Sequence, residues 1–238
     1  MSIIINKLFH TINNNTIFQD ISLKIENSSF QSIVGLSGSG KSQLIHTIAN
    51  LNNKNEKIIK DKKIRISFQN NNLIPWLSAA DNVRICSTLS NAKRDELFKE
   101  FDLYKHKDKK PGELSGGMQQ RLSLIRAFAG EADLLLLDEP FSMLDIQNKN
   151  KNQQYLMKHW IQYKPTILLV THDIDEAIYF SQKVHFLSKT KKTIIKTYDI
   201  QEPYPRDYSK VKEKKSFQDI NKEISQQLEI EMNDNDSN

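Results

Sequence analysis

The sequence predicts an α/β fold with an inserted helical subdomain, and three observations support this prediction. Strand-like and helix-like segments alternate along most of the chain, which is typical of a core built on a parallel sheet. Leu134–Leu137 and Thr166–Val170 are almost entirely apolar, as expected for strands that are buried on both faces of such a sheet. Between residues 70 and 129 helical periodicity replaces the strand pattern, which predicts the insert.

The individual elements can be predicted in chain order. Two N-terminal strands, Ile3–Phe9 and Thr16–Ile25, are joined by an Asn-rich turn and form an antiparallel pair. Further strands are expected at 30–34, Ile64–Phe68, Asp133–Leu137, Thr166–Val170, Val184–Ser188 and Thr193–Thr197. Helices are expected at 44–51, Ser78–Leu89, Lys93–Leu103, Arg121–Phe128 and Ile146–Tyr163.

The C-terminal part has a composition of its own. Glu202–Arg206, with two prolines, indicates the end of the main domain, so we expect a domain at 1–202 and an extension at 203–238. Within the extension, Phe217–Ile230 has the apolar spacing of one short amphipathic helix. The residues from Met232 onward lack apolar content and are expected to be disordered.

The charge balance gives little support for nucleic-acid binding. The chain has 34 Lys and Arg against 29 Asp and Glu, a formal net charge of +5. The lysines are scattered and largely lack interleaved aromatic residues, unlike a nucleic-acid-binding face. The single cysteine, Cys86, cannot form an internal disulfide, and no apolar run is long enough to span a bilayer. We therefore expect a cytosolic chain without a secretion signal.

Gly35–Ser42 carries the first chemical signal. This Gly-Leu-Ser-Gly-Ser-Gly-Lys-Ser segment lies between a predicted buried strand and a predicted helix, the context that a phosphate-binding loop requires. Its glycines allow several backbone N–H groups to point at one anion, next to the helix N-terminus. Lys41 would reach the β- and γ-phosphates of a nucleotide, and the Ser42 hydroxyl would bind Mg²⁺.

Asp138 and Glu139 carry the second signal. They follow a predicted buried strand, and open α/β sheets bind their ligands at the carboxyl ends of such strands. A carboxylate at this place can hold Mg²⁺ through water, and its neighbour can orient or deprotonate an attacking water. Together with the phosphate-binding loop, the pair predicts nucleotide hydrolysis.

Leu114–Arg121, with the sequence Leu-Ser-Gly-Gly-Met-Gln-Gln-Arg, resembles the signature sequence of ATP-binding-cassette (ABC) ATPases. Further family motifs occur in the expected order: Gln69 at the Q-loop, Leu134–Pro140 at the second Walker motif, Ser142–Asp145 at the D-loop and His172 at the switch histidine. The resemblance extends over residues 3–200. It implies a phosphate-loop NTPase core of RecA-like type, a mixed sheet with antiparallel N-terminal strands and a helical subdomain at about 70–129.

The resemblance also implies the cofactors, ATP and Mg²⁺, and a role for each matching residue. The residues expected to contact ATP in the same subunit are Phe9, Gly35, Ser37, Gly38, Ser39, Gly40, Lys41, Ser42 and Gln69. Those expected at Mg²⁺ are Ser42, Gln69 and Asp138. Glu139 would be the general base, assisted by His172, Gln69 and Lys41. Phe9 would stack on adenine, with the adjacent His10 as the alternative.

A second set of residues is expected to act on the nucleotide of another subunit. In the family the signature contacts the γ-phosphate in trans, and a helix N-terminus with exposed N–H groups suits that role. The residues implied are Ser115, Gly116, Gly117, Gln119 and Asp145. The active unit would be a head-to-tail homodimer with two ATP molecules between its subunits.

Leu73–Ser78 resembles the nitrate, sulfonate and bicarbonate (taurine-type) importer branch, as do the segments 138–145 and 171–177. The resemblance implies an ATP-hydrolysing subunit at the cytoplasmic face of the inner membrane. Membrane permease subunits would contact the chain near Leu73–Ser78, and a solute-binding protein would act indirectly. Trp76 suits a groove for a partner helix, and the alternative is a core residue of the subdomain.

Other functions remain open at this point. The chain could serve another importer or exporter branch of the family. A nucleic-acid-acting ABC-type ATPase would need a long coiled-coil or zinc insert, yet Lys41 and Leu114 are only 73 residues apart and no CxxC motif is present. A non-catalytic subunit would be expected to lack Glu139 or His172, and both are present. Met143 stands where alanine is more common in the family, and Gln43 where threonine is usual.

Overall fold

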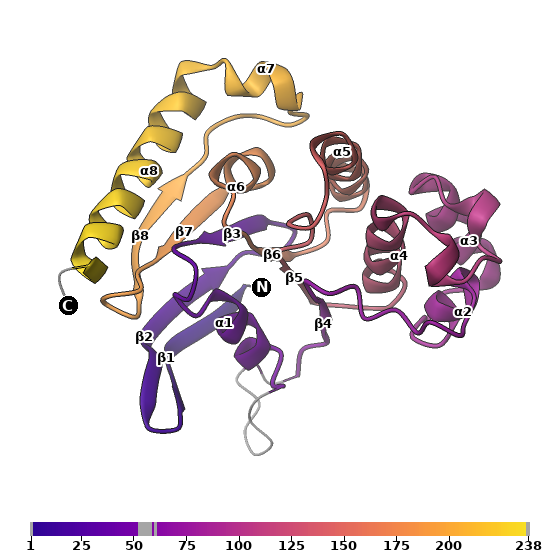
Figure 1. Ribbon diagram of the computed structural model, residues 1–238, viewed down its shortest axis with the longest axis horizontal. Coiled ribbons are helices and arrows are strands. Elements are labelled where there is room, and N and C mark those ends of the chain that lie inside the picture. The colour runs from indigo at the N-terminus through magenta and orange to yellow at the C-terminus, as the bar shows by residue number, and fades with distance from the viewer. Residues whose placement is uncertain (1, 52–58, 60, 237–238) are drawn as a thin grey trace. The chain divides into compact units, whose positions relative to one another are not determined.

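The computed structural model describes residues 2–51, 59 and 61–236, and Figure 1 shows it as a ribbon. The chain divides into two compact units. The first unit combines residues 1–62 with 165–238, and the second unit is the continuous segment 63–164. The boundaries predicted at residues 202 and 203 therefore do not separate the units, because the C-terminal extension belongs to the first one.

The first unit begins with an antiparallel hairpin of β1 (Ile3–Ile12) and β2 (Asn15–Ile25). The turn residues Asn13 and Asn14 have positive φ angles of 49° and 64°, which Asn tolerates better than most residues. The register shifts between Ile5 and Leu8, where Lys7 has a φ of 49°. This irregularity changes which later side chains share a face of the hairpin.

The main strands of the first unit form a mostly parallel arrangement. β3 (Phe30–Val34) pairs in parallel with β6 (Ile167–Val170) on one side and with β7 (Lys183–Leu187) on the other, and β8 (Ile194–Asp199) is antiparallel to β7. Every residue of β3 and β6 is buried. The apolar runs in the sequence thus correspond to strands covered on both faces.

The described part of the first unit also contains helices, which Figure 1 labels. They are α1 (Lys41–Ile48), α6 (Ile174–Phe180), α7 (Tyr208–Lys212) and α8 (Lys215–Asp236). α6 contacts β3 and β7 as well as α7 and α8. The extension therefore holds two helices rather than one short helix. α8 continues through Met232, where disorder was expected, and only residues 237–238 lie outside the described part there.

The second unit has two parallel strands, β4 (Ile64–Ser67) and β5 (Leu134–Asp138), with Ile66 opposite Leu136. Its helical elements are α2 (Ala79–Arg84), α3 (Asn91–Glu100), η1 (Tyr104–His106), η2 (Pro111–Glu113), α4 (Gly116–Phe128) and α5 (Ile146–Tyr163). α2 is shorter than predicted, whereas α4 begins at the signature, five residues before the predicted start at Arg121.

Arg65 connects β4 to the helical elements of the second unit. Its guanidinium donates to the carbonyls of Ala127 (3.0 Å), Cys86 (3.0 Å) and Arg126 (2.8 Å). A Cβ at Gly130 would lie 2.0 Å from Arg65 Nη1, so a larger residue there would displace the guanidinium from these carbonyls. None of the helices in the described part of the chain is long and apolar enough to cross a membrane.

Candidate nucleotide-binding site

The phosphate-binding loop of the first unit connects β3 to α1. β3 ends at Val34, and α1 begins at Lys41 with Gly40 as its N-cap. Gly38 and Gly40 have φ angles of 76° and 94°, which L side chains rarely adopt. A Cβ at Gly40 would also lie 2.9 Å from Ile17 Cγ2 of the hairpin. The loop therefore requires glycines at these positions.

The polar groups of the loop suit a phosphate. The Lys41 ammonium is on the inner side of the loop, where it donates to the carbonyls of Gly35 and Leu36, both at 2.9 Å. Lys41 is only 5 % exposed, and Ser39 is buried as well. Within the described residues the Ser39 hydroxyl has no hydrogen-bond partner. A buried hydroxyl without a partner is costly, and a phosphate oxygen at the loop would satisfy it.

His172 belongs to the same unit and follows β6. Ile33 of β3 pairs with Val170 of β6, and the Thr171 N–H donates to the Ile33 carbonyl at 3.2 Å. Because parallel strands end at the same edge of a sheet, His172 follows the strand next to the one that leads into the phosphate-binding loop. Asp173 then caps α6 by accepting from the Glu176 N–H at 3.0 Å. His172 is thus on a short segment that is fixed at both ends.

Phe9 and His10 lie on opposite faces of β1. His10 is opposite Phe18, and their rings stack with centroids 5.4 Å apart. The Phe18 ring lies 3.8 Å from a Cβ position at Gly40, so His10 is on the face towards the phosphate-binding loop. Phe9 is 55 % exposed and lines a different hollow, with Lys7, Gln19, Asp20 and Thr193. The geometry favours His10 for contact with a base.

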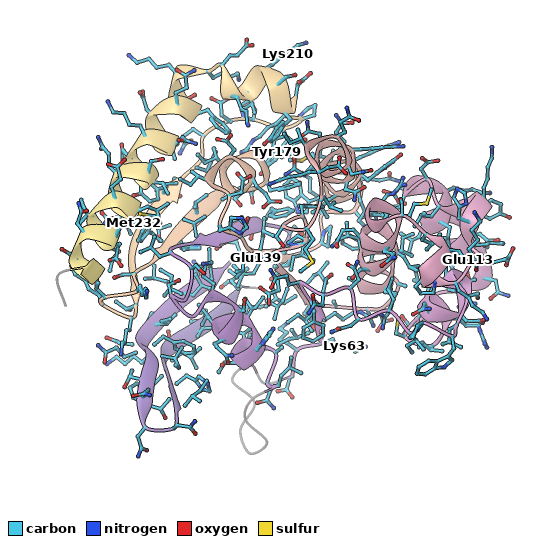
Figure 2. All side chains as sticks on the ribbon, in the orientation of Figure 1. Lys63, Glu113, Glu139, Tyr179, Lys210 and Met232 are labelled. Carbon is cyan, nitrogen blue, oxygen red and sulfur yellow. The ribbon has the colours of Figure 1, made fainter. Side chains whose placement is uncertain are left out.

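In the second unit, Glu139 and Gln69 lie together at the ends of β5 and β4. Gln69 Nε2 is 3.3 Å from Glu139 Oε2 and 3.4 Å from Ser142 Oγ. These contacts bring the residues predicted for the Q-loop, the second Walker motif and the D-loop into one group. Glu139, which Figure 2 labels, is the residue that follows β5. Asp138, the last residue of β5, is buried.

The backbone at Glu139 is strained. Its φ is 43°, in the left-handed region that non-glycine residues rarely adopt. Ser142 stabilises this turn, because its N–H and hydroxyl both donate to the Glu139 carbonyl, at 3.2 and 3.0 Å. Backbone strain of this kind is held in place by the surrounding structure and is common at active sites. The turn fixes the Glu139 backbone, and Gln69 Nε2 contacts the Glu139 carboxylate at 3.3 Å.

The signature segment forms the N-terminus of α4. Ser115 is the N-cap, and its hydroxyl accepts from the Met118 N–H at 3.4 Å. Gln119 points back along the chain, with Nε2 donating to the carbonyls of Pro111 (3.0 Å) and Leu114 (3.2 Å). Ser115 and Gly116 are exposed, whereas Gly117 is buried. The segment therefore presents a helix N-terminus that can receive an anion.

The D-loop is linked to the signature by two residues that sequence reasoning missed. Asp145 caps α5 and binds Asn148, which donates its backbone N–H at 3.0 Å and its amide at 2.7 Å. These hydrogen bonds lower the pKa of the Asp145 carboxyl. A Cβ at Gly117 would lie 2.8 Å from Asn148 Oδ1, and Asn152 Nδ2 donates to the Gly117 carbonyl at 3.1 Å. An Asp-x-x-Asn pattern predicts a helix cap, but not this contact.

The candidate residues thus form two groups. The phosphate-binding loop, His10 and His172 belong to the first unit, and Gln69, Asp138, Glu139, Ser115–Gln119 and Asp145 belong to the second.

Comparison with known proteins identifies the family. A model of the ABC transporter family matches residues 18–142, which include the phosphate-binding loop, the signature and Glu139. The chain belongs to this family, so it is an ATP-binding-cassette ATPase. The predicted α/β phosphate-loop fold with an antiparallel N-terminal pair is confirmed.

Similar proteins are known by name. The aliphatic sulfonates import ATP-binding protein SsuB of Bacillus cereus is 36 % identical over 226 residues, which cover 90 % of this chain and 88 % of that protein. The nitrate import ATP-binding protein NrtD of Synechocystis is 34 % identical over 232 residues, covering 88 % and 87 %. The bicarbonate transport ATP-binding protein CmpC of Synechocystis is 36 % identical over 223 residues, covering 86 % of this chain and 33 % of that protein.

Two solved structures show the same fold. A dimeric bacterial ABC transporter cassette has a TM-score of 0.70 and 28 % identity, covering 85 % of this chain and all of that one. A dimeric ATP-binding cassette in a post-hydrolysis state, bound to ADP and Pi, has a TM-score of 0.69 at the same identity and coverage.

Proposed function

We propose that this chain is the ATP-hydrolysing subunit of an importer for nitrate-, sulfonate- or bicarbonate-type solutes, which works through membrane permease subunits. The observation that carries the ATPase part is the Glu139 carboxylate, which follows β5 on a turn with a φ of 43° and has Gln69 Nε2 at 3.3 Å. The solute class is supported by the relatives, which are named as ATP-binding proteins of sulfonate import, nitrate import and bicarbonate transport.

ATP would bind at the phosphate-binding loop. The backbone of Gly35, Ser37, Gly38 and Gly40 would surround the phosphates, as glycine-rich loops before a helix do. Lys41 would exchange its two carbonyl partners for phosphate oxygens, and the Ser39 hydroxyl would gain the partner that it lacks among the described residues. We assign the base contact to His10 rather than Phe9, because His10 is on the face towards the loop.

Mg²⁺ would neutralise charge that develops on the phosphates. Ser42 would provide its hydroxyl as a ligand, and Asp138 and Gln69 would hold the ion directly or through water, since Mg²⁺ usually keeps several waters beside phosphate ligands.

For hydrolysis, Glu139 would accept a proton from the attacking water. His172 would donate a hydrogen bond to the γ-phosphate and stabilise the negative charge that grows there. Gln69 is within hydrogen-bond distance of both Glu139 and Ser142. It would therefore contact the attacking water beside Glu139 and the D-loop at the same time.

The signature would act in trans within a head-to-tail homodimer. Ser115, Gly116 and Gly117 would offer the α4 N-terminus to the γ-phosphate of the partner's ATP, and Gln119 would hold the segment in shape. Asp145 would couple the two sites through Asn148, which touches both Asp145 and Gly117. The dimeric state of both solved relatives supports this arrangement.

The permease contact would lie on the loop Leu73–Ser78. Asn82, which is fully buried, fixes this loop by accepting from the Ile74 N–H (2.8 Å) and donating to the carbonyls of Ile74 (3.0 Å) and Leu77 (3.2 Å). Trp76 is 73 % exposed on it, so the alternative of a core residue is wrong. An exposed tryptophan on a rigid loop suits a partner surface. The subunit would then sit at the cytoplasmic face of the inner membrane, with a solute-binding protein acting indirectly.

The test of the ATPase mechanism is Glu139→Gln. This variant keeps the size and hydrogen bonding of the side chain but cannot accept the proton. Hydrolysis should fall by about 10²–10⁴-fold while ATP binding is retained. The matched control is Glu131→Gln, which removes an exposed acid of the same unit that pairs with Lys63 and should hydrolyse ATP like the wild type. Near-normal turnover in Glu139→Gln would remove Glu139 from the role of general base.

A further inference from the structure

Glu231, near the end of α8, is a buried carboxylate that binds the turn between β7 and β8. It is only 2 % exposed. Its carboxylate accepts hydrogen bonds from the hydroxyls of Ser188 (2.5 Å) and Thr190 (3.1 Å) and from the N–H groups of Lys189 (2.9 Å) and Thr190 (3.2 Å). Figure 2 labels the neighbouring Met232 close to this end of α8. One side chain of the C-terminal extension thus binds both backbone and hydroxyl groups of the turn 188–190.

This turn lies against the phosphate-binding loop. A Cβ at Gly35 would be 2.4 Å from the Leu187 carbonyl oxygen, and a Cβ position at Gly38 is 3.9 Å from Lys189 Cε. A cavity of about 370 Å³ is lined by residues of the hairpin, the loop and the turn, namely Thr16, Ile17, Gly38, Ser39, Lys189, Thr190 and Lys192. The aliphatic part of Lys189 is therefore next to the glycine that would face the phosphates.

The turn is also fixed on its other side. The Gln19 N–H of β2 donates to the Lys192 carbonyl at 2.8 Å, and Thr193 Oγ1 donates to the Asp20 carbonyl at 3.3 Å. In the part of the chain that the structure describes, no carboxylate forms an ion pair with the Lys189 ammonium. A fixed turn thus carries a lysine with an uncommitted charge beside a phosphate-binding loop, and a phosphate chain is the anion that fits there.

We propose that Lys189 binds the phosphate chain of the nucleotide, and that Glu231 is the positioning residue that holds its turn against the phosphate-binding loop. The proposal rests on the proposed function, because it assumes that ATP binds at Gly35–Ser42. It gives the C-terminal extension a part in nucleotide affinity: the anchor at Glu231 is 42 residues from Lys189 in sequence, and it lies on α8.

The ionisation of Glu231 agrees with this role. Burial alone would raise the pKa of the Glu231 carboxyl, but the hydrogen bonds from Ser188, Thr190 and Lys189 outweigh burial and lower it. The carboxylate is thus charged at neutral pH, which charge-assisted hydrogen bonds to backbone N–H groups require.

The first test compares Lys189→Gln with Lys191→Gln. Lys191 is an exposed lysine of the same turn whose side chain does not line the cavity, so it is the matched control. ATP and ADP should bind about fivefold more weakly to Lys189→Gln, as expected for one partly solvated charge contact, while adenosine binding should not change. Lys191→Gln should bind all three like the wild type. Equal ATP affinity of Lys189→Gln and wild type would overturn the proposal.

The second test asks whether Glu231 acts through Lys189. In the full chain, Glu231→Gln should weaken ATP binding to a similar degree, raising KM with little change in kcat. In the Lys189→Gln background the same substitution should have no further effect on ATP affinity, because residues that act as one unit are not additive. Fully additive losses would overturn the positioning role. Lys189→Gln replaces a half-exposed side chain, so it tests the phosphate contact even if Glu231→Gln folds poorly.

Failure of this proposal can be told apart from failure of the proposed function. If the wild type binds ATP, Lys41→Ala abolishes binding and Lys189→Gln has no effect, then the ATP site stands and only the role of Lys189 is wrong. If the wild type does not bind ATP, the proposed function itself is wrong.

Discussion

His185 of β7 is buried with a defined tautomer. Its Nε2 is 2.8 Å from Gln31 Oε1, which can only accept, so Nε2 carries the proton. Its Nδ1 is 2.9 Å from Thr197 Oγ1 and accepts from that hydroxyl. Burial lowers the pKa of the imidazole to about 4, with the Lys183 charge acting in the same direction and Glu26 against it. The folded state therefore requires a neutral His185.

The stability of the first unit should fall between pH 6.5 and pH 4 for this reason. The unfolded imidazole binds a proton below about pH 6.5, whereas the folded one does not until about pH 4, so the unfolded state holds more protons in this window. Up to about 3 kcal/mol of unfolding free energy should be lost across it. His185→Gln should flatten this dependence in urea titrations at pH 7, 6, 5 and 4. An unchanged slope in the variant would contradict this assignment.

The base contact illustrates what a sequence can predict about single residues. The roles proposed for Lys41, Gln69, Glu139 and His172 rest on motifs, and each motif occupies one short segment. Whether Phe9 or His10 faces the loop depends on strand parity, and a bulge at Lys7 shifts the register of β1. A single extra residue moves every later side chain to the other face, so parity after an unseen bulge cannot be read from the sequence.

At the scale of elements, Arg206 explains why the extension belongs to the first unit. Its Nη1 donates to three carbonyls at the C-terminal end of α6, those of Ile178 (2.6 Å), Tyr179 (2.9 Å) and Ser181 (2.9 Å). The last carbonyls of a helix have no partners within the helix, and here a guanidinium with five donors supplies them. α6 is the helix that follows His172, so Arg206 of the extension helps to hold the segment that carries His172.

The lengths of elements were harder to predict than their existence. α4 begins at Gly116 because the Ser115 hydroxyl caps the helix. The sequence did not predict this start, since glycine is a poor helix former and two glycines follow the cap. α8 extends to Asp236 through a polar stretch that looked disordered by composition. Glu231 explains this length, because its buried carboxylate accepts hydrogen bonds from the β7–β8 turn and so holds the last turns of α8 in place. Such long-range contacts leave no local pattern in the sequence.

A substitution at Trp76 tests whether the loop Leu73–Ser78 contacts permease subunits. Trp76→Ala removes an exposed side chain from a loop whose backbone is fixed by Asn82, so folding and basal ATPase activity should stay close to wild type. Binding to permease subunits should weaken by about tenfold or more, because truncating a buried interface tryptophan commonly costs about 2 kcal/mol. Co-purification with tagged permease subunits measures this. Leu51→Ala, at an exposed apolar position of the first unit, is the control.

At the scale of the molecule, the two units divide the chemistry. The first unit holds the phosphate-binding loop and His172, and the second holds Glu139 and the signature. In the proposed mechanism, hydrolysis would need residues from both units. The exposed N-terminus of α4 offers an anion-binding surface that a nucleotide in another copy would use, which makes the homodimer the expected active unit.

Mixing two inactive variants tests this arrangement. Lys41→Ala removes the phosphate contact, and Gly116→Asp adds a negative charge at the α4 N-terminus, where a Cβ meets nothing within 4 Å and an acid stabilises the helix. Each variant alone should be inactive. If the signature acts in trans, mixed dimers contain one intact site, and an equal mixture should recover up to roughly a quarter of wild-type ATPase activity. If it acts in cis, no mixed dimer has an intact site and no activity returns. The control mixes wild type with the double variant that carries both Lys41→Ala and Gly116→Asp. If the signature acts in trans, each site of such a mixed dimer contains one damaged segment. The ATPase activity should then come from the wild-type dimers alone.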